Sequence, residues 1–217
     1  LLQRDVRELA AIERATELPR LFSLLAARSA GLLNHAELSR TAGLPQTTLK
    51  RYTALFELVF LHREVPAWSG NMSKRLVKAP KLFVADPGLA AHALGVTEAR
   101  LASTPDAWGP LLETFVATEL IRQLAGSGSR ARLYHHRSHS GQEVDLVLED
   151  PQGRLVGIEV KARHSLDKRD LQGLKGLAAD LPDRLHRGIV LYTGTETVPL
   201  GDRLVACPVE ALWRVGG

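Results

Sequence analysis

The chain has 217 residues, of which 45% are hydrophobic and 24% charged, proportions that are ordinary for a globular protein. This composition excludes wholesale disorder, a collagen-like fibre and a small disulfide scaffold, and the length suits one large domain or two small ones. No apolar run approaches the roughly 20 residues needed to span a bilayer, so we expect no membrane association. The lone Cys207 cannot form an internal disulfide, which favours a cytoplasmic location.

The net charge of +4 is unevenly distributed along the chain. Residues 1–105 hold 14 Lys and Arg against 9 Asp and Glu, whereas residues 106–217 hold 14 against 15. A basic N-terminal half favours an anionic partner such as DNA. An ordinary solvated surface can carry the same charges, so charge alone does not separate these two interpretations.

Apolar residues at helical spacing predict several helices in the first half. The first presents one apolar face made by Leu2, Val6, Leu9 and Ile12. A second begins at Pro19, and a third begins after Asn34, with Glu37 three residues on, as in a capped helix N-terminus. That third helix ends near Gly43, and a fourth starts within residues 44–48. The last two helices and the turn between them form a helix-turn-helix pattern.

Two extended segments, 59–65 and 81–85, follow the helix-turn-helix and enclose a polar loop. This order is the outline of a winged helix, which we assign to residues 1–97. The recognition helix and the wing region would supply the DNA contacts, because basic side chains there can reach phosphates. The predicted contacts are Lys50, Arg51, Lys74, Arg75 and Lys78. Packing of this face against another domain or protomer is the alternative, and the oligomeric state stays open.

Residues 97–107 are polar and contain Pro105, which predicts a domain boundary. The second predicted domain, residues 98–217, reads as a helix, three strands, a helix and further strands, an order typical of a three-layered α/β domain. The helices are expected at 111–124, 167–179 and 209–213. The strands are expected at 132–137, 143–149, 155–161, 187–192 and 203–206.

Charged residues alternate with apolar ones on two of these strands. Glu143 and Asp145 share one face of the first strand, and Glu159 and Lys161 share one face of the second. Pairing through the turn at 150–153 can bring Asp145 beside Glu159. Two carboxylates suit a hard divalent cation such as Mg²⁺, and a lysine beside it can orient water or stabilise charge on a phosphate.

The segment from Asp145 to Glu159-Val160-Lys161 resembles the D…(D/E)xK signature of the PD-(D/E)xK nuclease superfamily, although no proline precedes Asp145. The resemblance implies a restriction-endonuclease-like α/β fold and a Mg²⁺- or Mn²⁺-dependent site with Asp145, Glu159 and Lys161 as catalytic residues. It also implies a supporting metal-site acid on the first helix, Glu113, with Glu119 as the alternative. Gln172 on the following helix can reach such a site. The expected fold class is therefore α/β for the second domain, and α+β for the chain as a whole, because the first domain is mainly helical.

Several motifs in order extend the resemblance over nearly the whole chain. They are Leu2-Gln3-Arg4-Asp5-Val6, Thr48-Leu49-Lys50-Arg51-Tyr52, Lys81-Leu82-Phe83-Val84-Ala85-Asp86-Pro87-Gly88-Leu89, Leu112-Glu113-Thr114-Phe115-Val116 and Tyr134-His135-His136-Arg137. With the acidic motifs they resemble the C-terminal region of predicted prokaryotic AAA-type ATPases, which implies an ATPase module as a partner in the full-length chain. No G-x-x-x-x-G-K-[ST] motif occurs, so we expect no ATP site here. The absence of this motif and of an initiator Met predicts a C-terminal fragment.

Two functions follow from these patterns. The first is a divalent-metal-dependent nuclease attached to an ATPase, and the second is a non-catalytic module that binds DNA or a protein for the ATPase. A zinc site is not expected from His135, His136, His139 and His164, because their spacing matches no zinc motif. The stretch 135–142 is instead expected near the acidic residues, where a histidine can touch a substrate phosphate.

Overall fold

The computed structural model of the protein describes residues 15–71, 73, 75, 78–103, 108–138 and 141–214. The helix expected from Leu2 to Ile12 lies outside the described residues. The chain divides into two compact units, the first comprising Leu1–Val65 and Ala79–Thr114 and the second Pro66–Lys78 and Phe115–Gly217. The fold is mixed α/β. In the part of the chain that the structure describes, no helix is both long enough and apolar enough to cross a membrane.

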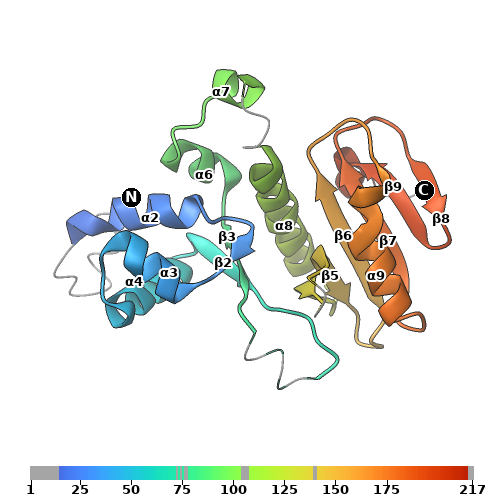
Figure 1. Ribbon diagram of the computed structural model, residues 1–217, viewed down its shortest axis with the longest axis horizontal. Helices are drawn as coiled ribbons and strands as arrows, with labels where there is room; N and C mark the ends of the chain where they lie inside the picture. The colour runs from blue at the N-terminus through green and yellow to red at the C-terminus, as the bar shows by residue number, and fades with distance from the viewer. Residues whose placement is uncertain are drawn as a thin grey trace. The chain divides into compact units, whose positions relative to one another are not determined.

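The first unit combines helices with a small sheet (Figure 1). Its helical elements are η1 (Ala15–Glu17), α2 (Leu18–Ala26), α3 (His35–Ala42), α4 (Gln46–Leu58), α6 (Pro87–Ala93), α7 (Glu98–Ser103) and the beginning of α8 (Trp108–Gly126). Its strands are β1 (Gly31–Leu32), β2 (His62–Val65) and β3 (Lys81–Val84). They form an antiparallel sheet in the order β1-β3-β2.

Residues at the two ends of α3 explain where this helix begins and where the chain turns toward α4. Asn34 caps α3, because its Oδ1 accepts a hydrogen bond of 3.1 Å from the Glu37 amide. Gly43 ends the helix with a φ of 69°, a left-handed conformation that glycine adopts readily. The apolar side of α4 is buried, and its Phe56 ring meets Phe22 of α2 edge-on at 5.9 Å. This packing fixes α4 with its polar residues outward.

The second unit is built on a six-stranded sheet in the order β4-β5-β6-β7-β9-β8. The strands are β4 (Arg132–Arg137), β5 (Glu143–Glu149), β6 (Leu155–Lys161), β7 (Leu185–Tyr192), β8 (Val198–Gly201) and β9 (Leu204–Pro208). Strands β4, β5 and β6 are antiparallel neighbours, β6, β7 and β9 are parallel, and β8 is antiparallel to β9. The helical elements are the rest of α8, η3 (Lys168–Leu171), α9 (Gln172–Asp180) and η4 (Val209–Trp213).

Helix α9 packs against one face of this sheet, where Figure 1 shows it in orange beside β6 and β7. Its Leu174 and Leu177 are buried against two strand glycines. A Cβ atom at Gly157 would lie 2.8 Å from Leu174 Cδ2 and 3.0 Å from Leu177 Cδ2, so any larger residue would force these leucine side chains to move. The close contact brings the start of α9 beside the ends of β5 and β6.

Four segments differ from the sequence-based expectations. Strands β1 and β8 were not predicted, and α7 occupies part of the polar stretch expected to be a boundary. Residues Pro66–Lys78, expected as the wing, belong to the second unit. The reason is backbone pairing: the Trp68 amide donates to the His135 carbonyl at 2.6 Å, and the His135 amide donates to the Pro66 carbonyl at 3.0 Å. This segment therefore extends the second unit at β4.

Candidate functional site

A cavity of about 430 Å³ lies in the second unit beside β5, β6 and the start of α9. Charged and polar side chains dominate its wall, in contrast to the apolar face between the sheet and α9. The lining residues are Gly141, Gln142, Glu143, Asp145, Glu159, Lys161, Arg169, Asp170, Gln172 and Gly173. Titratable groups that converge in a cavity and shift one another's pKa make it a candidate functional site.

Asp145 and Glu159 meet in this cavity from neighbouring strands. The ladder pairs Leu146 of β5 with Ile158 of β6, so the next residues outward, Asp145 and Glu159, stand opposite each other. Asp145 Oδ2 accepts a hydrogen bond of 2.9 Å from the Val160 amide, and its side chain is hydrogen-bonded to the Glu159 carboxyl group. The strand pairing thus places two carboxyl groups in direct contact.

Lys161 completes the group from the same face of β6. Its Nζ donates to Glu159 Oε2 at 2.7 Å. The Glu159 side chain is only 6% exposed, whereas that of Lys161 is 24% exposed. The ammonium group therefore lies on the more open side of the carboxylate that it contacts, where it can face a ligand.

The charges of this group are strongly coupled. Burial, reinforced by the negative charge of Asp145, raises the pKa of Glu159 from 4.5 to about 8 despite the opposing effect of Lys161. Burial alone would lower the pKa of Lys161, but the charges of Glu159 and Asp145 outweigh it and raise that pKa. At neutral pH the site accordingly holds a protonated lysine and one proton associated with its two carboxyl groups.

This coupling predicts a pH-dependent stability. Between pH 4.5 and about 8 the folded protein retains a proton at Glu159 that the unfolded chain releases, so the free energy of unfolding should fall as the pH rises through this window. Glu159→Gln should flatten that part of the profile, because the amide does not titrate. Urea titrations from pH 5 to 9 measure the effect. Identical pH profiles for the variant and the wild type would contradict it.

The other acidic residues proposed from the sequence occupy different surroundings. Glu113 belongs to the first unit, where its Oε1 accepts a hydrogen bond of 2.7 Å from Lys81. Glu119 accepts hydrogen bonds from Arg122, Gln123 and Trp213, and it does not line the cavity. Glu119 therefore links α8 to the C-terminal element η4 through its hydrogen bond with Trp213.

Glu143 and Gln172 do line the cavity. Glu143 lies 3.2 Å from Arg137, while Lys161 contacts Glu159. Glu143 and Lys161, which lie on neighbouring strands and carry opposite charges, therefore each contact a different residue. Of the stretch 135–142, Gly141 and Gln142 line the cavity, His135 and His136 do not, and His139 lies outside the described residues.

Asp170 is a cavity residue that the sequence reasoning missed. It is buried and accepts a hydrogen bond of 2.8 Å from the Asp167 amide, and its charge contributes to the raised pKa of Lys161. The usable signal was the capping box Asp167-x-x-Asp170 a few residues after the end of β6, which fixes the start of η3. This cap starts η3 at a position where the helix packs against β6.

The predicted DNA contacts are divided between the two units. Lys50 and Arg51 are exposed on α4 of the first unit. Arg75 and Lys78 belong to the second unit, where Arg75 donates to Glu149 at 2.7 and 2.9 Å and Lys78 Nζ lies 3.5 Å from the Arg137 carbonyl. Lys74 lies outside the described residues. Only Lys50 and Arg51 are thus placed on one exposed helix.

Comparisons with known proteins find two separate domain matches along the chain. Residues 1–100 match a domain of unknown function, DUF8612, and residues 108–212 match a second, DUF4143. The uncharacterized proteins Rv2008c of Mycobacterium tuberculosis and Mb2031c of Mycobacterium bovis are each 30% identical to this chain over 215 residues. That stretch covers 99% of this chain but 47% of each relative, so the chain spans about half their length. No solved structure matches it significantly.

Proposed function

We propose that the second unit is a nuclease-type domain that hydrolyses phosphodiesters with Mg²⁺ or Mn²⁺. The observation that carries this proposal is the convergence of Asp145, Glu159 and Lys161 on one polar cavity. The order of α8, β4, β5, β6, α9 and β7 supports it, because a helix, three antiparallel strands, a helix and a strand is the core that the PD-(D/E)xK resemblance implies.

The donor set fits a hard divalent ion. Asp145 and Glu159 offer carboxylate oxygens side by side, which Mg²⁺ and Mn²⁺ prefer, and the polar wall leaves room for water. The ion, when bound, would supply Lewis acidity and a water of lowered pKa. Binding would also release the proton that the two carboxyl groups hold, because both must be ionised to act as ligands.

The residues of the chain itself have separable tasks in this proposal. The Val160 amide fixes the Asp145 carboxylate by donating to Oδ2, so its orientation does not depend on a ligand. Glu159 holds Lys161 in place through the 2.7 Å contact with Nζ. The lysine ammonium would then face the phosphate and stabilise the charge that grows on it during attack by water.

We further propose that residues 1–97 form a winged helix and that residues 98–217 form the nuclease-like domain. The sheet order β1-β3-β2 with α3 and α4 supports the first assignment, and the exposed Lys50 and Arg51 on α4 support DNA as the partner. DUF4143 is often associated with AAA-type ATPases, which supports an ATPase module as a second partner. A cytoplasmic location is part of the same proposal.

A direct cleavage assay tests the nuclease proposal. The purified chain should nick plasmid DNA or shorten single-stranded DNA in the presence of Mn²⁺ and not in the presence of a chelator. Absence of cleavage on both substrates, repeated with the full-length protein, would reject the nuclease and leave the non-catalytic binding module.

DNA binding by the first unit gives a separate prediction. Replacing Lys50 and Arg51 with Ala should weaken DNA binding and reduce the slope of log K against log salt by about 2, since each phosphate contact contributes about 1. Gel-shift titrations at several salt concentrations measure this slope. Arg20→Ala with Arg100→Ala is the control, because it removes two exposed charges from the same unit. Equal losses in both double variants would show that net charge, not α4, determines binding.

A further inference from the structure

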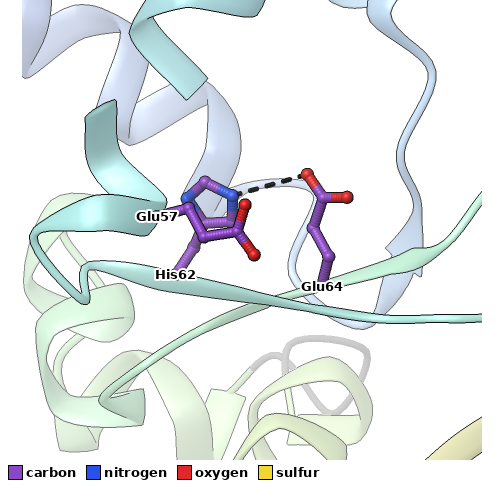
Figure 2. Close-up of side chains that lie close together, drawn as sticks. All are labelled: Glu57, His62 and Glu64. Carbon is purple, nitrogen blue, oxygen red and sulfur yellow. Dashed lines mark ion pairs between the residues drawn. The ribbon is translucent and has the colours of Figure 1, made fainter. Parts of the chain in front are cut away.

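The turn between α4 and β2 in the first unit gathers three side chains that carry metal-binding atoms. Glu57 comes from the last turn of α4, and His62 and Glu64 come from the same face of β2. One ligand atom from each lies within 4.8 Å of the other two. Figure 2 shows the Glu57 carboxylate in front of the imidazole ring and the Glu64 carboxylate beside it, joined to the ring by the dashed ion pair. No sequence motif marks this cluster.

His62 is the unusual member of this cluster. Its side chain is fully buried, at 0% exposure, and neither ring nitrogen has a hydrogen-bond partner among the described residues. Nε2 is 3.7 Å from Glu64 Oε1, the contact drawn in Figure 2, which is too long for a hydrogen bond. Buried polar atoms are almost always paired, so an unpaired imidazole aimed at two carboxylates requires a partner.

We propose that His62, Glu57 and Glu64 bind a divalent first-row transition-metal ion, Zn²⁺ by preference. One imidazole nitrogen and two carboxylates form a mixed N/O set that suits Zn²⁺ better than Mg²⁺, for which oxygen alone is usual. Ligand atoms around tetrahedral Zn²⁺ lie about 3.4 Å apart, given metal–ligand distances of about 2.1 Å. The 3.7 Å separation of His62 from Glu64 needs little adjustment to reach this geometry.

The ion would brace the chain reversal between the helix and the strand. All three ligands come from residues 57–64, and between them Phe60 has a φ of 59°, a left-handed conformation that is rare for an aromatic residue. A metal bridging the end of α4 to β2 would stabilise this turn and fix the helix that carries Lys50 and Arg51. The site is distinct from the acidic cavity, which is formed by residues of the second unit.

The test uses the full chain carrying Asp145→Asn, so that the acidic cavity does not compete for metal. After chelator treatment and dialysis, Zn²⁺ affinity is measured by competition with a chromophoric chelator, and Co²⁺ is added as a spectroscopic probe. We expect one equivalent of Zn²⁺ and a visible Co²⁺ absorption band. Glu64→Gln and Glu57→Gln should each weaken Zn²⁺ binding at least tenfold and diminish the Co²⁺ band, because each removes a charged ligand while keeping its shape.

His62→Gln tests the nitrogen ligand, and the two Glu variants keep the proposal falsifiable should that buried substitution prevent folding. His92→Gln is the matched control, since His92 is exposed on α6 of the same unit. It should retain the affinity of the parent protein. No Zn²⁺ binding by the parent, or equal affinity in the Glu64→Gln, Glu57→Gln and His92→Gln variants, would overturn the site.

Discussion

Lys161→Ala is expected to reduce Mn²⁺-dependent DNA cleavage by at least about a hundredfold while leaving folding and DNA affinity close to those of the wild type. Negative charge grows on the phosphate as water attacks, and a fixed ammonium stabilises that charge more in the transition state than in the ground state. The rate should therefore fall much more than the affinity. Folding should survive, because Glu159, with a pKa of about 8, already holds a proton at neutral pH and leaves no uncompensated charge when its partner is lost.

The decisive measurement compares initial cleavage rates on plasmid and single-stranded DNA, together with thermal melting of each protein. Lys175→Ala is the matched control, because Lys175 is an exposed lysine on α9 in the same unit. It should cleave at the wild-type rate. If Lys161→Ala cleaves as fast as Lys175→Ala, the lysine has no role in chemistry and serves only as the ion-pair partner of Glu159.

Local signals in the sequence were sufficient for most of the individual elements. Strict alternation predicted β5, and the Asn34 cap and Gly43 predicted the bounds of α3 to within a residue. Strands β1 and β8 were not predicted, each for a different reason. β1 has only two residues, too few to show any period, whereas β8 contains Pro199, which fits an edge strand but argues against a central one.

Hydrophobic periodicity in the sequence could not predict which distant segments pair with each other. Residues 66–78 were expected as a wing because of their composition, yet Trp68 and His135 join this segment to β4 through backbone hydrogen bonds. Nothing within those residues indicates a partner almost 70 positions away. The same limit explains why Arg75 was proposed as a DNA contact although its guanidinium group binds Glu149.

In the candidate site, too, residues that are close in the sequence were predicted to meet, whereas a residue from a later element was not. Asp145, Glu159 and Lys161 are separated by one turn, so strand alternation and a single hairpin were enough to expect them together. Asp170 enters from the following helix, and its approach depends on how η3 packs over β6. Glu57, His62 and Glu64 were missed because four residues with a left-handed turn separate the helix ligand from the strand ligands.

Glu149 is the centre of the contacts that hold residues 66–78 against the second unit. Its carboxylate accepts hydrogen bonds from Arg75 at 2.7 and 2.9 Å, from Arg184 at 2.8 Å and from Trp68 Nε1 at 3.2 Å. The side chains of Arg75 and Glu149 are only 10% and 13% exposed. The guanidinium group of Arg75 also lies over the Tyr134 and Trp68 rings, so it is enclosed on several sides.

Glu149→Ala is therefore expected to lower the free energy of unfolding of the second unit by about 3–5 kcal/mol, since removing one partner of a buried ion pair leaves an uncompensated charge. Arg75→Met should cost less, because Glu149 would keep Arg184 and Trp68 as donors. Urea denaturation followed by tryptophan fluorescence measures the loss. Limited trypsinolysis should also show faster cleavage within residues 66–78, because the segment would lose its main anchor.

Arg154→Ala is the control for Glu149→Ala, because it removes an ordinary surface ion pair, and the losses in free energy of unfolding can be compared. Arg154 lies 2.6 Å from Asp150, but its side chain is 62% exposed, so its removal should cost less than about 1 kcal/mol. A similar small loss for Glu149→Ala would mean that backbone pairing with β4 alone holds residues 66–78. In that case Arg75 would be available to contact a ligand, and its place among the DNA-binding residues would be restored.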